Sequence, residues 1–223
     1  VNKRQILSWS SGKDSAWSLN VLRQTPGIEV AGLLTTVNET LDRVAMHGVR
    51  RTLLDAQAEA AGVPLHIVPL PSPCPNDVYE ARMTMFVREA QADGVEAIAF
   101  GDLHLEDIRA YRETRLSGTG LKPLFPLWQL DTHDLARRMI NSGLRAKITC
   151  HDPSKLPRTL AGREFDMDFL RDLPDGIDPC GEMAEFHTFA YAGPMFARAI
   201  AISTGESVDR DGFVFADLDF PTS

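Results

Sequence analysis

The sequence Ser10-Ser11-Gly12-Lys13-Asp14-Ser15 lies between an apolar run at residues 5–8 and an amphipathic pattern at residues 14–23. These two patterns predict a strand, a tight loop and a helix in that order. At such a junction the backbone N–H groups of the first helical turn and the helix dipole face whatever occupies the loop. The sequence therefore predicts an anion-binding loop at the carboxyl end of the first strand.

The side chains of this loop suit a nucleotide phosphate. Gly12 lets the backbone approach phosphate oxygens, Lys13 adds a positive charge, and the serine hydroxyls are further donors. The carboxylate of Asp14 is a ligand that Mg²⁺ prefers. The loop is not a Walker A motif, because Leu7 occupies the position of its first glycine and Asp14 follows the lysine. The alternative is a purely structural role, in which the loop is a simple turn and Ser11 or Asp14 caps the helix.

Strands and helices alternate through the first hundred residues. Gly62 and Gly94 are predicted to end two of the helices, and Asn76 to cap one. This alternation is typical of an α/β fold, with a parallel sheet and helices on both faces, whose ligands bind beyond the carboxyl ends of the strands. Segments 36–48 and 101–107 are expected there with the loop. The predicted strands are residues 5–8, 29–36, 65–70 and 97–101, and the predicted helices are 14–23, 49–61 and 77–92.

Beyond Asp107 the pattern changes to short mixed elements separated by proline and glycine. A helix is predicted at residues 134–141, a strand at 146–150 and a closing strand at 213–216. We expect a smaller α+β C-terminal lobe, with the first domain at residues 1–106 and the second at 107–223. The apolar closing strand and the turn around Phe196 are candidate contacts of a homodimer.

Composition narrows the class of protein. The chain has 223 residues and a net charge of −8, from 31 acidic and 23 basic residues, which disfavours nucleic acid as a partner. The three scattered cysteines argue against a disulfide framework or a zinc ribbon and suit a reducing cytoplasm. The absence of an apolar run of about 18 residues predicts a protein without a membrane span.

The loop resembles the Ser-Gly-Gly-X-Asp-Ser loop of the PP-loop ATP pyrophosphatases, with Ser11 in place of one glycine. These proteins belong to the adenine nucleotide alpha-hydrolases, whose HUP domain is Rossmann-like. The resemblance implies that ATP is cleaved at its α-phosphate and pyrophosphate is released. It leaves the acceptor open, because amidotransferases, tRNA-modifying enzymes and sulfur transferases share the loop.

Further segments are similar to the diphthine–ammonia ligase family and its bacterial relatives, and the resemblance covers nearly the whole chain. It implies that ATP, with Mg²⁺, adenylates a carboxylate on a protein or a small molecule, and that free ammonia then displaces AMP to form an amide. The segments that carry it are Gly101-Asp102, residues 120–128, Asp178-Pro179-Cys180-Gly181-Glu182, Glu185-Phe186-His187-Thr188-Phe189, Asn38-Glu39 and Met46-His47-Gly48.

The resemblance also implies roles for individual residues. ATP binding falls to Ser10, Ser11, Gly12, Lys13, Asp14, Ser15, Leu34, Thr35, Thr36, Gly101 and Asp102, with Asp14 holding Mg²⁺ and residues 34–36 meeting adenine through their backbone. An acyl-adenylate needs cations near its developing charge and a base or docking site for ammonia. The catalytic candidates are Lys13, Asp14, Arg112, Glu113, Glu182, Glu185 and His187.

Several of these assignments have structural alternatives. Glu182 and Glu185 share a helix face only if their segment is helical, and a loop is the alternative. His187 beside two phenylalanines can be a structural histidine. We interpret Cys180 as a buried structural residue, although a nucleophile or sulfur carrier is the alternative. Cys150-His151 and His104 lack the spacing of metal ligands.

The sequence departs from the family pattern at two positions. Met183-Ala184 interrupts the usual Gly-Glu-Asn-Gly-Glu, so a position that favours glycine carries a side chain. Residues 112–116 lack the cysteine often found after this arginine and glutamate. Two other functions stay open: a PP-loop tRNA-modifying or sulfur-transfer ATPase, and a non-catalytic ATP-binding regulator.

Overall fold

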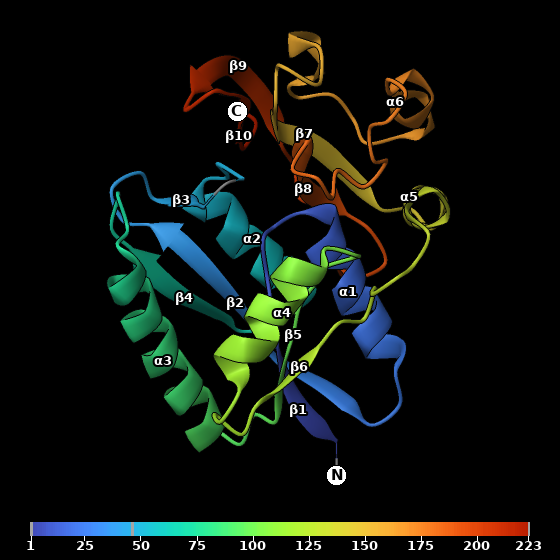
Figure 1. Ribbon diagram of the computed structural model, residues 1–223. Coiled ribbons are helices and arrows are strands. Elements are labelled where there is room, and N and C mark those ends of the chain that lie inside the picture. The colour runs from blue at the N-terminus through green and yellow to red at the C-terminus, as the bar shows by residue number, and fades with distance from the viewer. Residues whose placement is uncertain (1, 46, 223) are drawn as a thin grey trace.

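The computed structural model describes residues 2–45 and 47–222, which form two β-sheets with helices around them (Figure 1). Sheet A has five parallel strands in the order β4-β2-β1-β5-β6, and the short β3 pairs antiparallel with the end of β2. The strands are β1 (Lys3–Ser8), β2 (Ile28–Asn38), β3 (Arg43–Val44), β4 (Leu65–Leu70), β5 (Ala97–Ala99) and β6 (Lys122–Leu124).

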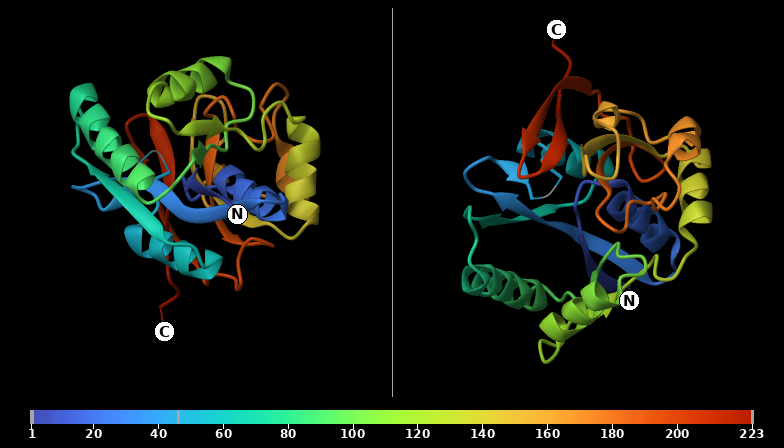
Figure 2. Two further views of the ribbon diagram at one scale, coloured as in Figure 1. Left: turned by 90° about the horizontal axis from the view of Figure 1, so that it is seen from below. Right: turned by 45° about the horizontal axis from the view of Figure 1, so that its top comes forward.

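Helices cover both faces of sheet A, as predicted (Figure 2). On one face α1 (Lys13–Gln24) and α2 (Arg51–Ala61) pack into the larger apolar core, and on the other α3 (Asn76–Ala92) and α4 (Glu106–Leu116) pack into a smaller one. Successive residues of β1 contribute to the two cores, because side chains of a strand alternate between its faces: Ile6 belongs to the smaller core and Leu7 to the larger. The α/β class is confirmed.

The order of the strands reverses beside β1. From β1 the chain moves through β2 to β4, then returns to the other side of β1 for β5 and β6. In an open parallel sheet, ligands bind in the crevice where the order reverses, beyond the carboxyl ends of the strands. The loops that follow β1 and β5 border that crevice, and they carry residues 9–12 and 100–105.

The C-terminal lobe is built on an antiparallel sheet B, with strand order β8-β7-β10-β9. This confirms a smaller lobe of mixed elements. The division after residue 106 remains an expectation; β6 lies beyond it and pairs with β5 in sheet A. The elements of the lobe are α5 (Thr132–Asn141), β7 (Arg145–His151), the 3-10 helix η1 (Arg158–Leu160), α6 (Met167–Asp172), β8 (Phe186–Ala192), β9 (Ser203–Arg210) and β10 (Phe213–Asp219).

Direct hydrogen bonds join the two sheets at residues 10–15, which we call the phosphate loop because the sequence predicts phosphate binding there. The backbone N–H of Ala190 in β8 donates to the carbonyl of Ser11 at 3.0 Å. The buried amide of Gln57 in α2 donates to the carbonyls of Ser11 and Ala190, at 2.9 and 2.6 Å, and accepts from the indole N–H of Trp9 at 2.9 Å. The larger apolar core also runs from α1 and α2 into sheet B. The second lobe therefore packs directly against the phosphate loop of the first lobe.

Some predicted boundaries are wrong for identifiable reasons. Helix α2 begins at Arg51, two residues late, because the Val49 carbonyl accepts a hydrogen bond from Val44 in the turn after β3. Asn76 is the first residue of α3, whose N-cap is Pro75 and makes no side-chain cap bond. Gly62 does end α2, in the left-handed conformation at φ 63°.

Other sequence predictions can be checked against the fold. All three cysteines are free, and Phe196 packs edge-on against Trp9 within the core, with ring centroids 6.3 Å apart. Among the described residues no helix is both long and apolar enough to cross a membrane.

Candidate functional site

A cavity of about 810 Å³ opens at the carboxyl ends of the sheet A strands. The loop after β1, the end of β2, helices α3 and α4, and the segment 180–188 of the second lobe all contribute to its lining. It brings together most of the predicted site residues: Ser10, Lys13, Asp14, Ser15, Leu34, Thr35, Thr36, Gly101, Asp102, Arg112, Glu182 and His187.

The loop backbone at Ser11 and Gly12 is tightly constrained. Ser11 has φ 69°, a left-handed conformation that favours glycine, and its buried hydroxyl has no partner among the described residues. A Cβ atom added to Gly12 would lie 2.8 Å from Cε1 of His47. Neither residue lines the cavity, so their role in phosphate binding stays a prediction.

A residue of the second lobe caps the N-terminus of α1. The hydroxyl of Thr188 in β8 accepts the backbone N–H of Lys13 at 3.0 Å, while the N-cap, Gly12, has no side-chain bond. The interpretation that Ser11 or Asp14 caps the helix is therefore wrong. The hydroxyl of Ser15 donates to the Gly12 carbonyl at 3.0 Å and lies 3.3 Å from that of Ser10.

Lys13 is a buried cation between the lobes. It is 1% exposed, and its Nζ donates to Asp14 at 2.8 Å and to the carbonyl of Cys180. The rings of Phe165 and Phe186 lie 5.6 and 5.4 Å from Nζ. Burial alone would lower the pKa of Lys13, but the neighbouring carboxylate of Asp14 outweighs it, so the pKa is raised and the lysine stays charged.

Two carboxylates in the cavity have oxygens without a hydrogen bond among the described residues. Asp14 uses Oδ2 for Lys13 and leaves Oδ1 buried without one, and Oδ2 of Asp102 has only the ion pair with Arg112. Burial raises the pKa of both acids, against the opposing effects of Lys13 and Arg112. Two such carboxylates beside a loop that the sequence predicts to bind phosphate fit Mg²⁺, which protein sites usually hold through one or two carboxylates plus phosphates. The described residues contain no all-protein cluster of three or more metal-binding side chains.

Arg112 brings a positive charge to the cavity from α4. Its Nε lies 3.5 Å from Oδ2 of Asp102, and its guanidinium lies 4.9 Å from the centroid of the Phe100 ring. Glu113, the neighbouring candidate, instead accepts from Arg109 on the exposed side of α4 at 2.7 Å and does not line the cavity.

Glu182 ties the second lobe to the loop after β5. Its Oε1 accepts the backbone N–H groups of Leu103 and His104, at 2.9 and 3.1 Å. Burial raises the pKa of Glu182, and these two hydrogen bonds oppose the shift. A helix face shared with Glu185 is not formed, because the segment is a turn in which Ala184 has φ 57°. Glu185 lines a second cavity instead.

His187 lies against a second histidine that the sequence analysis gave no role. The rings of His47 and His187 have centroids 4.7 Å apart, and Nδ1 of His47 is 3.0 Å from the Thr188 carbonyl, to which it donates as a neutral ring. Burial lowers the pKa of His47 to about 3 and that of His187 to about 4. Both rings are therefore neutral near pH 7, and Nε2 of His187 has no partner among the described residues.

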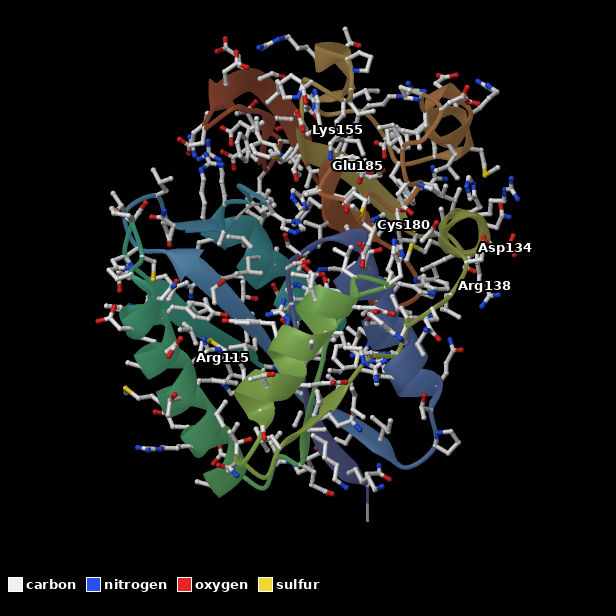
Figure 3. The ribbon with its side chains drawn as sticks, viewed as in Figure 1. Arg115, Asp134, Arg138, Lys155, Cys180 and Glu185 are labelled. Carbon is white, nitrogen blue, oxygen red and sulfur yellow. The ribbon has the colours of Figure 1, made fainter. Side chains whose placement is uncertain are left out.

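The end of β2 and the groove between α3 and α4 form the rest of the cavity. Leu34, Thr35 and Thr36 line it, and the Thr35 hydroxyl donates to the Trp9 carbonyl at 2.7 Å. Arg115 of α4 reaches Glu80 of α3 across the outer part of the groove (Figure 3). Sequence reasoning missed these two residues, because α4 was not predicted and the helical pattern of α3 alone did not show that Glu80 faced another helix.

Cys180 fits the structural interpretation. Its side chain is buried, its Sγ lies 3.5 Å from the carbonyl of Thr132, and burial raises the pKa of its thiol. A raised pKa disfavours the thiolate that a nucleophile or sulfur carrier requires. The contribution of Cys180 to the site is its carbonyl, which accepts from Lys13.

His47, Gln57 and Thr188 also help to form the site and received no individual role from the sequence. His47 and Thr188 belong to segments that the family resemblance had singled out, whereas Gln57 had no signal beyond being a polar residue on the apolar face of a predicted helix. Met46, from the same segment as His47, lies outside the described residues.

Comparison with known proteins gives matches along nearly the whole chain. A family model for the diphthamide synthase N-terminal domain matches residues 3–123, and one for the diphthamide synthase C-terminal domain matches residues 131–216. A diphthine–ammonia ligase of Danio rerio is 28% identical over 95% of this chain and 91% of its own length. Those of Homo sapiens and Bos taurus are 27% and 26% identical, each over 94% of this chain and 86% of its own length. These relatives do not favour a tRNA-modifying, sulfur-transfer or regulatory protein.

Proposed function

Because the chain belongs to the diphthamide synthase family, we propose that it is an ATP-dependent ligase that adenylates a carboxylate and converts it to an amide with ammonia. The observation that carries the proposal is the single cavity in which the loop of Lys13 and Asp14 faces Glu182 and His187 of the second lobe. Residues of the two lobes would thus act on the same bound molecules. ATP, ammonia and Mg²⁺ enter the proposal on the strength of the family.

The first step places the phosphates of ATP at the amino end of α1. Hydroxyls of Ser10 and Ser15 and the free N–H groups of the helix's first turn would bind phosphate oxygens. An oxygen of the acceptor carboxylate attacks the α-phosphorus, the bond from that phosphorus to the bridging oxygen breaks, and pyrophosphate leaves. Arg112 offsets the negative charge of the leaving group.

The carboxylates of Asp14 and Asp102 would hold Mg²⁺, which supplies charge neutralisation to the phosphates when it is bound. Both side chains line the cavity and have an oxygen without a hydrogen bond among the described residues. Lys13, fixed by Asp14 and the Cys180 carbonyl, keeps one side of Asp14 occupied and so leaves Oδ1 directed to other ligands.

In the second step the nitrogen of ammonia attacks the acyl carbon. The bond between that carbon and the oxygen of AMP breaks, so AMP leaves and an amide remains, and the nitrogen loses one proton. The neutral ring of His187 has an unbonded Nε2 in the cavity and is the base that we assign to this proton. Glu182 holds the β5 loop, and with it Asp102, in position.

The proposal is tested by screening carboxylic acids for AMP release with and without ammonium. Diphthine is the first acid to test, because the relatives are named for it. We expect the correct acid to support exchange of labelled pyrophosphate into ATP without ammonium, and to give AMP and an amide with it. ADP as the product would contradict the proposal, as would AMP release that does not depend on ammonium.

Asp14→Asn tests the loop within the same assay. The amide keeps the shape of the side chain and an acceptor for Lys13 but removes the charge, so pyrophosphate exchange should fall on the order of 100-fold. Asp77→Asn is the matched control, because Asp77 also lies in the first turn of a helix but is exposed outside the cavity. Equal exchange by both variants would remove Asp14 from the site.

A further inference from the structure

A second cavity, of about 770 Å³, lies on the other side of the loop that precedes β8. We call residues 178–186 the partition loop, because its residues line the two cavities in turn. Asp178, Pro179, Met183 and Glu185 line the second cavity, whereas Cys180, Gly181, Glu182, Ala184 and Phe186 line the first. A wall one peptide segment thick therefore separates the candidate ATP site from the second cavity.

The partition loop is held in place at several points. The N–H of Cys180 donates to the Asp178 carboxylate at 2.6 Å, and the Glu185 carbonyl accepts from the N–H of Asp152 at 2.9 Å. Lys155, above the loop in Figure 3, donates to the Met183 carbonyl at 3.0 Å. The alternation of residues between the two cavities is thus a fixed feature of the wall.

Glu185 gives the second cavity an unpaired buried carboxylate. The residue is 3% exposed; Oε1 has one contact, with the N–H of Asp178 at 3.4 Å, and Oε2 has no partner among the described residues. An isolated buried carboxylate is costly unless a cation or donor meets it. Arg137 and Arg171 also line this cavity, but they pair with Asp134 and Asp168 and not with Glu185. A small cation that enters the cavity can therefore meet Oε2.

We propose that the second cavity is the ammonium-binding site and that Glu185 is the residue that binds it. The proposal rests on the ligase function above, which requires ammonia beside the acyl-adenylate in the first cavity. Ammonium held at Glu185 gives one proton to water in the second cavity, and neutral ammonia crosses the partition loop. Entry by this route keeps the nucleophile from competing with ATP and the acceptor for the mouth of the first cavity.

Cation binding tests the site without any acceptor. Rubidium has the charge of ammonium and a similar size, and its anomalous scattering locates it in crystals soaked in rubidium chloride. We expect one rubidium ion at Glu185, displaced by ammonium chloride and absent from Glu185→Gln. Rubidium bound elsewhere, or bound equally by that variant, would overturn the proposal. Glu164→Gln is the control, because Glu164 pairs with Lys147 in the same lobe but lines neither cavity.

Kinetics with the acid found by the screen give a second test. Glu185→Gln should keep pyrophosphate exchange, which needs no ammonia, while its KM for ammonium rises at least about tenfold, the scale of one charged contact. Hydroxylamine is a neutral nucleophile near pH 7 and should restore the rate of the variant to that of the wild type. An unchanged KM would refute the role of Glu185.

A variant at the mouth of the second cavity keeps the test decisive if Glu185→Gln folds poorly. Met183 is 54% exposed and lines this cavity, so Met183→Lys places an ammonium group beside Glu185. We expect a raised KM for ammonium with normal exchange, and an unchanged KM would count against the site. Failure of the ligase function itself looks different, because the wild type would then show no acid-dependent exchange.

Discussion

Ser11 stores backbone strain at a position where the related loops have glycine. Its φ of 69° costs an L-residue about 1 kcal/mol or more, and its buried hydroxyl lacks a partner among the described residues. The conformation is imposed from outside, because the Ser11 carbonyl accepts from both Gln57 and Ala190. The departure from the family pattern that the sequence showed at this residue thus has a measurable energetic consequence.

We predict that Ser11→Gly raises the free energy of unfolding by about 1 kcal/mol, since glycine adopts this φ without strain. Urea denaturation at pH 7.5 measures the change. Ser11→Ala is the control, because it removes the hydroxyl but keeps the strained Cβ, so it should recover only part of the gain. A full gain from alanine would assign the effect to the hydroxyl and not to the backbone.

The His47 and His187 pair makes stability depend on pH. The pKa values of about 3 and about 4 lie below the ordinary value of 6.5, so the unfolded chain binds protons more readily than the fold does. The stability due to the neutral rings is complete above pH 6.5 and is lost as the pH falls toward 4. Each histidine contributes a slope of up to about 1.4 kcal/mol per pH unit in that window.

We therefore expect the wild type to lose stability between pH 7 and pH 5 relative to a His47→Gln, His187→Gln double variant. Urea denaturation of both proteins at several pH values isolates the histidines, because Asp14, Asp102 and Glu182, whose raised pKa values act in the opposite direction, are common to the two. Parallel stability curves would contradict the neutral state of the pair.

At the scale of elements, the sequence predicts the strands and helices that have a regular apolar pattern. It misses the features that depend on pairing with another segment. The parallel strands β1, β2, β4 and β5 and the long helices α1, α2 and α3 follow from the apolar periodicity and the glycines at helix ends, whereas the short parallel strand β6 was not predicted. The start of α2 was misplaced because Val49 and Arg50 pair with β3 instead, through the bond from the Val44 N–H to the Val49 carbonyl and an antiparallel bridge between Arg43 and Arg50. Helix α4 was missed because its exposed, charged surface buries little beyond Leu116.

Prediction of the candidate site from the sequence is limited in the same way. The loop motif and the strand ends predicted Ser10, Asp14, Thr36 and Asp102 correctly as lining one cavity, because all of them lie near or beyond the carboxyl ends of parallel strands. Glu185 would share a face with Glu182 only in a helix; the segment is a turn, and the two carboxylates line different cavities because the turn at Ala184 rotates them apart. A left-handed alanine cannot be inferred from local pattern; only the resemblance to a glycine position hinted at it.

At the scale of the molecule, the two lobes meet at a hydrogen-bonded junction with Gln57 at its centre. This side chain is fully buried and joins three segments: the strand end at Trp9, the loop at Ser11 and strand β8 at Ala190. The apolar core is also continuous from α1 to sheet B. The phosphate loop and the second lobe are therefore expected to lose their structure together.

Gln57→Leu tests this coupling. Leucine fits the apolar surroundings but leaves the Trp9 N–H and the carbonyls of Ser11 and Ala190 with fewer partners in the core, so the free energy of unfolding should fall by about 3 kcal/mol. Gln24→Leu is the control, since Gln24 only bonds Asn20 on the outside of α1 at 3.1 Å, and it should change stability by less than about 0.5 kcal/mol.

Thermal unfolding of the wild type and both variants should remain a single transition by circular dichroism and tryptophan fluorescence, because Trp9 reports the junction itself. Two separate transitions in the wild type would show that the lobes fold independently, and the second lobe would then be a detachable cover of the phosphate loop.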